Sequence, residues 1–169
     1  MPPPDLRLLY DQAQQSPPGL TIENLQEEEH IFNEQVATAR QWLDDKDTRR
    51  RIAGAEQLGA YPTAEAEIAL NDALIFDSEA KVRAAAALSL AGFLPLDEMS
   101  IKNLLAALGD SSQDVQLNAL HTLNRYLLKQ EANTLAYQQL ISALTQKAKA
   151  KELTGTTRQS LEGLLLDLK

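Results

Sequence analysis

Residues able to carry out covalent or metal chemistry are few in this 169-residue sequence. There is no cysteine, which excludes a disulfide framework, a thiolate metal site and a cysteine nucleophile. The two histidines, His30 and His121, lie about 90 positions apart, whereas a catalytic zinc usually takes three protein ligands. No serine, histidine and aspartate occur in an arrangement that indicates a catalytic triad. We therefore expect no catalytic residue, no metal, no cofactor and no enzyme activity.

One glycine-containing segment could be mistaken for a phosphate-binding loop. Gly155-Thr156-Thr157 lacks the Gly-x-x-x-x-Gly-Lys-Ser/Thr spacing, and no strand is expected before it. Thr156 or Thr157 is better explained as the N-cap of a last helix. His121 stands among leucines and is expected to be packed or half-exposed rather than a ligand.

Composition indicates a single helical domain. Apolar residues make up 44% of the chain and charged residues 24%, as in ordinary soluble globular domains. Aromatic residues make up only 5%, whereas alanine and leucine dominate, which favours helices over strands. A length of 169 residues is typical of one domain.

The charges and the apolar runs bear on partners and location. The formal net charge is −8, and basic residues gather only at 49–51 and at Lys147, Lys149 and Lys151. Nucleic-acid binders usually present a basic face, so we expect no nucleic-acid partner. No apolar run approaches the ~20 residues that span a bilayer, and the N-terminus lacks the pattern of a signal peptide. A cytoplasmic location is expected, and a periplasmic one stays open if a signal sequence was removed.

Residues 77–109 predict a pair of short helices around which the rest of the chain is organised. Asp77 can begin the first helix and Gly92 can end it. Apolar residues on one side of this helix recur at steps of three and four: Val82, Ala86, Leu90 and Phe93, widened by Ala85 and Leu88. Asp97 can cap the second helix, which Gly109 closes.

Weaker copies of this pair lie on both sides of it. Corresponding positions recur 32 or 33 residues apart: Asp45, Asp77 and Asp110; Arg51 and Arg83; Gly59 and Gly92; Leu58, Leu90 and Leu123. Helix pairs with such a period cannot bury their apolar faces alone, so they stack into a solenoid. The second helices of the first and third pairs are expected to bury these residues: Ile68, Leu70, Leu74, Ile75, Leu135, Leu140, Ile141 and Leu144.

The repeated pattern, an aspartate followed by Val-Arg, alanine, leucine and glycine, resembles HEAT repeats, particularly the short type also found in phycobilisome lyases. The resemblance covers roughly residues 44–147. It implies an all-α fold, an α-α superhelix formed as a short HEAT-like solenoid of antiparallel helix pairs. The third unit departs from the family pattern because Gln116 replaces its arginine. Family members form ladders of aspartate and arginine between units, which implies a structural role for five residues: Asp45, Arg51, Asp77, Arg83 and Asp110.

The expected domain organisation is one solenoid preceded by an arm. The solenoid spans 21–169, with about three repeat pairs at 45–147 between capping helices at 21–44 and 156–168. The arm at 1–20 is rich in proline and either docks on the first helices or binds a partner or a second copy of the chain.

These observations predict a non-catalytic interaction module or scaffold that binds another protein or a peptide segment. The expected binding surface is the concave face formed by the second helices, with these polar candidates: Glu67, Asn71, Lys102, Asn103, Gln138, Gln139 and Ser142. The resemblance keeps an alternative open, an accessory subunit of a lyase or protein-modification enzyme related to bilin lyases. Three repeats make a short stack, so a homodimer is open as well.

Overall fold

The regular structure of the protein is helical throughout residues 22–132 and 134–168, the part of the chain that the computed structural model describes. The predicted arm at 1–20 lies outside this part. The helices are α2 (Ile22–Leu43), α3 (Thr48–Ala60), α4 (Ala64–Phe76), α5 (Ala80–Ser89), η1 (Leu90–Phe93), α6 (Glu98–Ala107), α7 (Gln113–Leu127), α8 (Leu135–Ala148) and α9 (Gly155–Asp167). The all-α prediction is confirmed.

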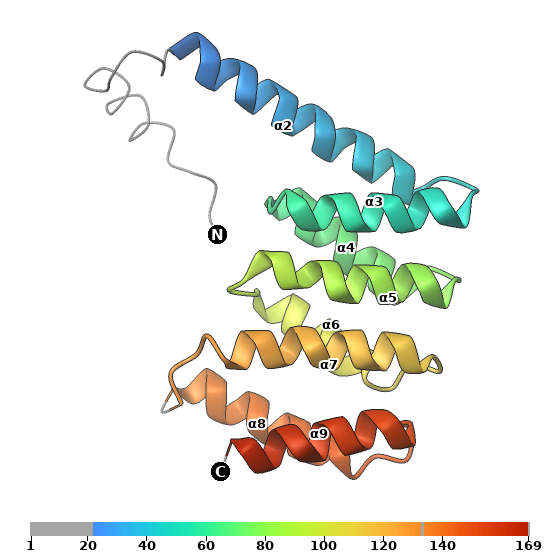
Figure 1. Ribbon diagram of the computed structural model, residues 1–169, viewed down its shortest axis with the longest axis vertical. Coiled ribbons are helices and arrows are strands. Elements are labelled where there is room, and N and C mark those ends of the chain that lie inside the picture. The colour runs from blue at the N-terminus through green and yellow to red at the C-terminus, as the bar shows by residue number, and fades with distance from the viewer. Residues whose placement is uncertain (1–21, 133, 169) are drawn as a thin grey trace.

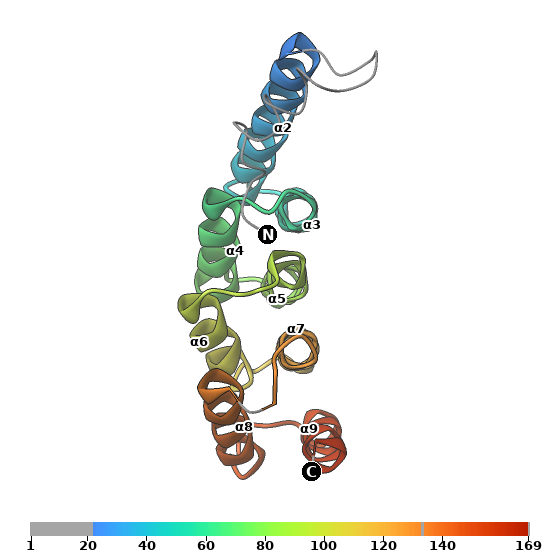
Figure 2. The ribbon, with the colours of Figure 1, turned by 90° about the vertical axis from the view of Figure 1, so that its left-hand side faces the viewer.

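The helices form two layers, and successive helices alternate between them (Figure 1). We call the layer of α3, α5, α7 and α9 the A layer and the layer of α2, α4, α6 and α8 the B layer (Figure 2). Neighbours pack within a layer, as α3 does on α5 and α5 on α7, and across layers, as α4 does on α5. The arrangement is solenoid-like. The two end helices, α2 and α9, belong to the B layer and to the A layer, respectively. The N-terminal half of α2 extends beyond the stack (Figure 1).

Buried leucines and close contacts between small residues hold the layers together. The core between the layers contains these fully buried leucines: Leu58, Leu70, Leu74, Leu90, Leu104, Leu108, Leu123, Leu127, Leu144 and Leu161. Gly92, in the η1 turn that follows α5, lies so close to the backbone of Gly59 on α3 that a Cβ at Gly92 would overlap the carbonyl oxygen of Gly59. The repeat therefore places glycine where two units have no room for a side chain.

Helix starts follow the expected chemistry, although two of them are shifted. Asp97 caps α6, as predicted, because its carboxylate accepts from the N–H of Ser100. Asp77 does not begin α5, since Glu79 stands at the N-cap position. Thr154, and not Thr156 or Thr157, caps α9. Each shift is one to three residues and leaves the helix itself in place.

The predicted apolar stripes are partly wrong. Leu70, Leu74, Leu140 and Leu144 are buried, but four residues assigned to the stripes are exposed: Ile68, Ile75, Leu88 and Leu135. In α4 the reason is composition, because apolar residues occur on every side of this helix and only one side meets the A layer. A stripe at steps of four, which includes Leu70 and Leu74, takes that side.

Candidate functional site

Two arginine–aspartate pairs join consecutive repeats at one edge of the stack. The guanidinium of Arg51 donates to both carboxylate oxygens of Asp77, with Nε–Oδ2 and Nη2–Oδ1 distances of 2.8 and 3.2 Å. Arg83 donates to Asp110 in the same manner at 2.8 and 3.0 Å. The third guanidinium nitrogen of each arginine caps carbonyl oxygens in the preceding turn, those of Asp45 and Asp77 respectively. Such bidentate pairs fix both distance and orientation.

Polar residues also occupy the corresponding positions at both ends of this ladder, but they form other hydrogen bonds. Gln116 takes the arginine position in the next repeat, where its amide donates to the carbonyl of Asp110 and accepts from the N–H of Thr154. Asp45, at the other end, accepts from its neighbours Asp47 and Arg50. The five predicted ladder residues thus lie on one edge, and Gln116 replaces an ion pair with neutral hydrogen bonds.

The pairing of Arg83 with Asp110 shifts the pKa of both groups. Burial acts to raise the pKa of Asp110, but the hydrogen bonds from Arg83 and from the N–H of Ser112 outweigh it and hold that pKa below its usual range. The hydrogen bond to Asp110 raises the pKa of Arg83. Both groups therefore stay charged, and their ion pair links two consecutive repeats.

Three of the predicted partner contacts belong instead to a polar network between α4 and α6. Asn71 is only 6% exposed and donates to Ser100 Oγ at 2.7 Å. Ser100 Oγ donates in turn to Glu67, and Asn103 donates to Asn71 Oδ1. The amide of Asn71 is thus bonded within the protein, and this network sets the register of two B-layer helices. The half-buried Glu67 and Asn103 support it.

The other predicted contacts lie on the surface. Lys102 on α6 and three residues on α8 are exposed: Gln138, Gln139 and Ser142. His121 is exposed rather than packed. His30 lies on the same helix as Glu34, and the distance between His30 Nε2 and Glu34 Oε1 is 3.3 Å. Within residues 26–132 and 134–168, no group of three or more histidine, aspartate or glutamate side chains could hold a metal ion.

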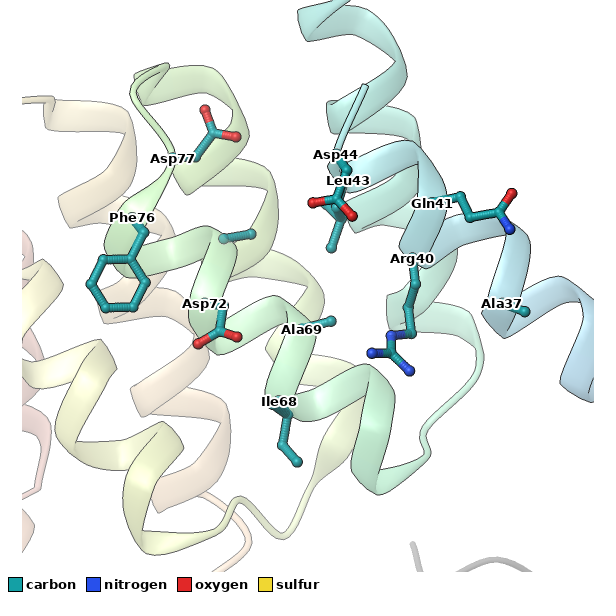
Figure 3. Close-up of a pocket in the computed structure, with 11 residues that line it drawn as sticks. Ala37, Arg40, Gln41, Leu43, Asp44, Ile68, Ala69, Asp72, Phe76 and Asp77 are labelled. Atoms are coloured by element: carbon teal, nitrogen blue, oxygen red, sulfur yellow. The ribbon is translucent and has the colours of Figure 1, made fainter. Parts of the chain in front are cut away.

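A groove that the sequence did not indicate lies between α2 and α4 (Figure 3). It encloses about 570 Å³, within the ~300–1,000 Å³ range of many binding sites. Three of its eleven lining residues are alanines: Ala37 on α2, and Ala69 and Ala73 on α4. Arg40 reaches from α2 into the space between the helices, as Figure 3 shows. The groove is therefore open to side chains of another molecule.

Along α4 the rim of this groove carries a stripe of apolar and acidic side chains. Ile68, Asp72 and Phe76 follow one another at steps of four, so they share one side of the helix. Ile68 is 63% exposed and Phe76 is 77% exposed. The run Ala73–Phe76 could have indicated this exposed stripe, because four consecutive apolar residues of a helix cannot all face one core.

Exposed apolar residues are concentrated on the B layer. In the described part of the chain, six of the nine large apolar residues that remain exposed belong to its helices: Ile31, Ile68, Ile75, Phe76, Met99 and Leu135. The other three are Leu88 in α5, Leu128 directly after α7 and Leu166 in α9. Residues at or near helix ends occur in both sets, since Phe76, Met99 and Leu135 of the B layer also lie there.

The two layers also differ in charge. The helices α2 and α4 carry eight acidic residues and a single basic one, Arg40. The helices α3 and α5 carry five basic residues and a single acidic one, Glu56. The groove therefore lies between the two more acidic helices, and Asp77 in its lining is paired with the ladder residue Arg51.

Comparison with known proteins does not assign the chain to a family. No protein-family model matches the sequence, and no curated protein matches it significantly. The HEAT resemblance therefore stays a prediction. Among residues 22–132 and 134–168, none of the helices has the length and apolarity needed to cross a membrane.

Proposed function

We propose that the protein is a non-catalytic interaction module that binds a segment of another protein on its B layer. The exposed apolar residues of that layer carry the proposal, because six of the nine large apolar residues exposed in the described part of the chain belong to it, and a protein partner buries such side chains at the core of its interface. In contrast, Arg51 and Arg83 on the A layer pair with aspartates and join consecutive repeats.

The B layer also offers exposed polar groups beside its apolar ones. Met99 and Lys102 lie on α6, and Leu135 and Gln139 lie on α8, all of them exposed. An apolar contact flanked by hydrogen-bonding groups is the usual composition of a protein interface. The buried Glu67–Asn71–Ser100 network holds α4 and α6 in fixed register, so this surface is pre-organised.

Site-specific photo-cross-linking tests the proposal. A photoreactive amino acid is placed at Met99 or Leu135 on the B layer and, in matched samples, at Leu88 or Leu128 on the A-layer side, all of which are exposed. After irradiation in the cells that make the protein, adducts are identified by mass spectrometry. We expect a defined partner from the B-layer positions and little of it from the other two.

A second measurement decides whether that partner binds at this surface. The partner identified by cross-linking is purified, and its affinity is measured for wild type and for a variant with Lys102→Glu and Gln139→Glu. The proposal requires weaker binding to the variant than to a control with Lys81→Glu on the A layer, where Lys81 is exposed. Equal binding to all three proteins, or adducts only from Leu88 and Leu128, would overturn it.

A further inference from the structure

We propose that the groove between α2 and α4 binds a basic amphipathic helix of a partner protein, with its apolar side chains against Ile68 and Phe76 and its cationic side chains toward Asp72 and Asp44. This inference rests on the proposed function and names the partner chemistry of one part of the B layer. Three features of the groove support the inference: its shape, its apolar rim and its charge.

The shape suits a segment whose side chains enter between two helices. Ala37, Ala69 and Ala73 have short side chains, so the groove admits side chains from outside where these three alanines line it. Ile68 and Phe76 are two helical turns apart on one side of α4, a spacing of about 11–12 Å. A helix laid along this side can match that spacing with apolar residues at its own i and i+7 positions.

The charges select a basic segment. Of the charged groups that line the groove, Asp77 is already paired with Arg51 at 2.8 Å. Asp44 and Asp72 are exposed and take part in no ion pair within residues 26–132 and 134–168. Within the lining itself, Arg40 is the one basic side chain, against the carboxylates of Asp44 and Asp72. The lining therefore carries a small net negative charge, which attracts a cationic partner.

Arg40 adds polarity to the site. Its guanidinium reaches into the groove between α2 and α4 (Figure 3) and forms no ion pair among the described residues. A carboxylate or a free carbonyl at one end of the bound helix would satisfy it. The C-terminal end of a helix presents such carbonyl oxygens, so the bound segment is expected to end near Arg40.

The probe for the test is a fluorescent peptide of leucine and lysine, about four helical turns long, with leucine at i, i+4 and i+7 and lysine at i+3, where it can reach Asp72 between Ile68 and Phe76. Two matched peptides serve as controls. One replaces lysine by glutamate, and the other keeps the composition in a shuffled order without an apolar face. Binding is measured by fluorescence anisotropy at low and at high salt, because screening weakens exposed charge pairs.

The groove variant combines Asp72→Lys with Phe76→Ser, and the control variant combines Glu162→Lys with Leu128→Ser. All four residues are exposed, so both variants are expected to fold, which circular dichroism checks. We expect wild type and the control variant to bind the lysine peptide equally, and the groove variant to bind it at least about tenfold more weakly. The glutamate and shuffled peptides should bind more weakly than the lysine peptide.

The inference is overturned if the groove variant binds the lysine peptide as wild type does, if the shuffled or glutamate peptide binds equally well, or if nothing binds. Sedimentation velocity adds a separate outcome. A wild-type dimer that the groove variant loses would assign the groove to a second copy of this chain and overturn the partner assignment. If the inference fails while Met99 and Leu135 still cross-link a partner, the proposed function stands.

Discussion

The ladder edge and the groove of this molecule treat their charged groups differently. On the A-layer side, Arg51 and Arg83 bind aspartates of the next repeat through two hydrogen bonds each. On the B layer, Arg40, Asp44 and Asp72 line an open groove beside exposed Ile68 and Phe76. Groups bonded within the protein stabilise it, whereas groups left to solvent are available to a partner.

The contrast has a thermodynamic basis. Exposed apolar and charged side chains add little to the free energy of unfolding, so their retention on one surface needs a reason other than stability. Buried and paired groups, in contrast, account for most large mutational effects. Substitutions that compare the two layers should therefore separate stability from binding, and four of them follow in order of expected size.

The largest loss of stability is expected from Gly92→Ala. The added Cβ would overlap the carbonyl oxygen of Gly59, so the A layer must move apart, at a cost of about 3 kcal/mol or more in the free energy of unfolding. Urea denaturation measures it. Gly163→Ala on α9 is the control, since a Cβ there meets nothing within 4 Å, and it should be neutral or slightly stabilising. Equal effects would show that the close approach of the two repeats is absent.

Two positions on α4 compare its two sides directly. Leu70→Ala should destabilise the protein by about 3 kcal/mol because Leu70 is fully buried. Ile68→Ala, two residues away and 63% exposed, should change stability by less than about 0.5 kcal/mol. Thermal unfolding of both variants checks the pair, and a large loss from Ile68→Ala would place that side chain in the core.

The ladder is tested by Arg83→Ala. Removing this guanidinium leaves the carboxylate of Asp110, whose side chain is only 14% exposed, without its bidentate partner. We expect a loss of about 2 kcal/mol. Lys81→Ala removes an exposed cation from the same helix and should cost little. If both variants lose the same free energy of unfolding, the Arg83–Asp110 pair contributes no more to stability than an exposed surface charge does.

The smallest effect concerns pH. The folded state holds the pKa of Asp110 below its unfolded value, so its contribution is present above about pH 4 and is lost as pH falls through the lower, folded pKa. Asp110→Asn should therefore be less stable than wild type near neutral pH, with a gap that narrows in acid. Urea unfolding across the acidic range measures the gap. A constant difference at every pH would assign the loss to packing and not to charge.

The sequence predicted the fold better than it predicted the surface. The 32- and 33-residue recurrence of aspartate, arginine, glycine and leucine was sufficient for the helical stack, since those residues mark turns and buried positions. It could not show which side of α4 faces the A layer, because apolar residues surround that helix. Nor could it show that Asn71 is buried against Ser100, a contact between residues 29 positions apart. The groove depends on the first of these facts, because Ile68 and Phe76 lie on the side of α4 that does not face the A layer.

Hydrogen–deuterium exchange with the lysine–leucine peptide tests the division between the layers most directly. The amides of residues 37–44 and 68–77, which include the lining of the groove, should exchange more slowly when the peptide is bound. The amides of α3, α5 and α7 should be unchanged. Protection confined to the A-layer helices, or spread evenly over both layers, would contradict the account.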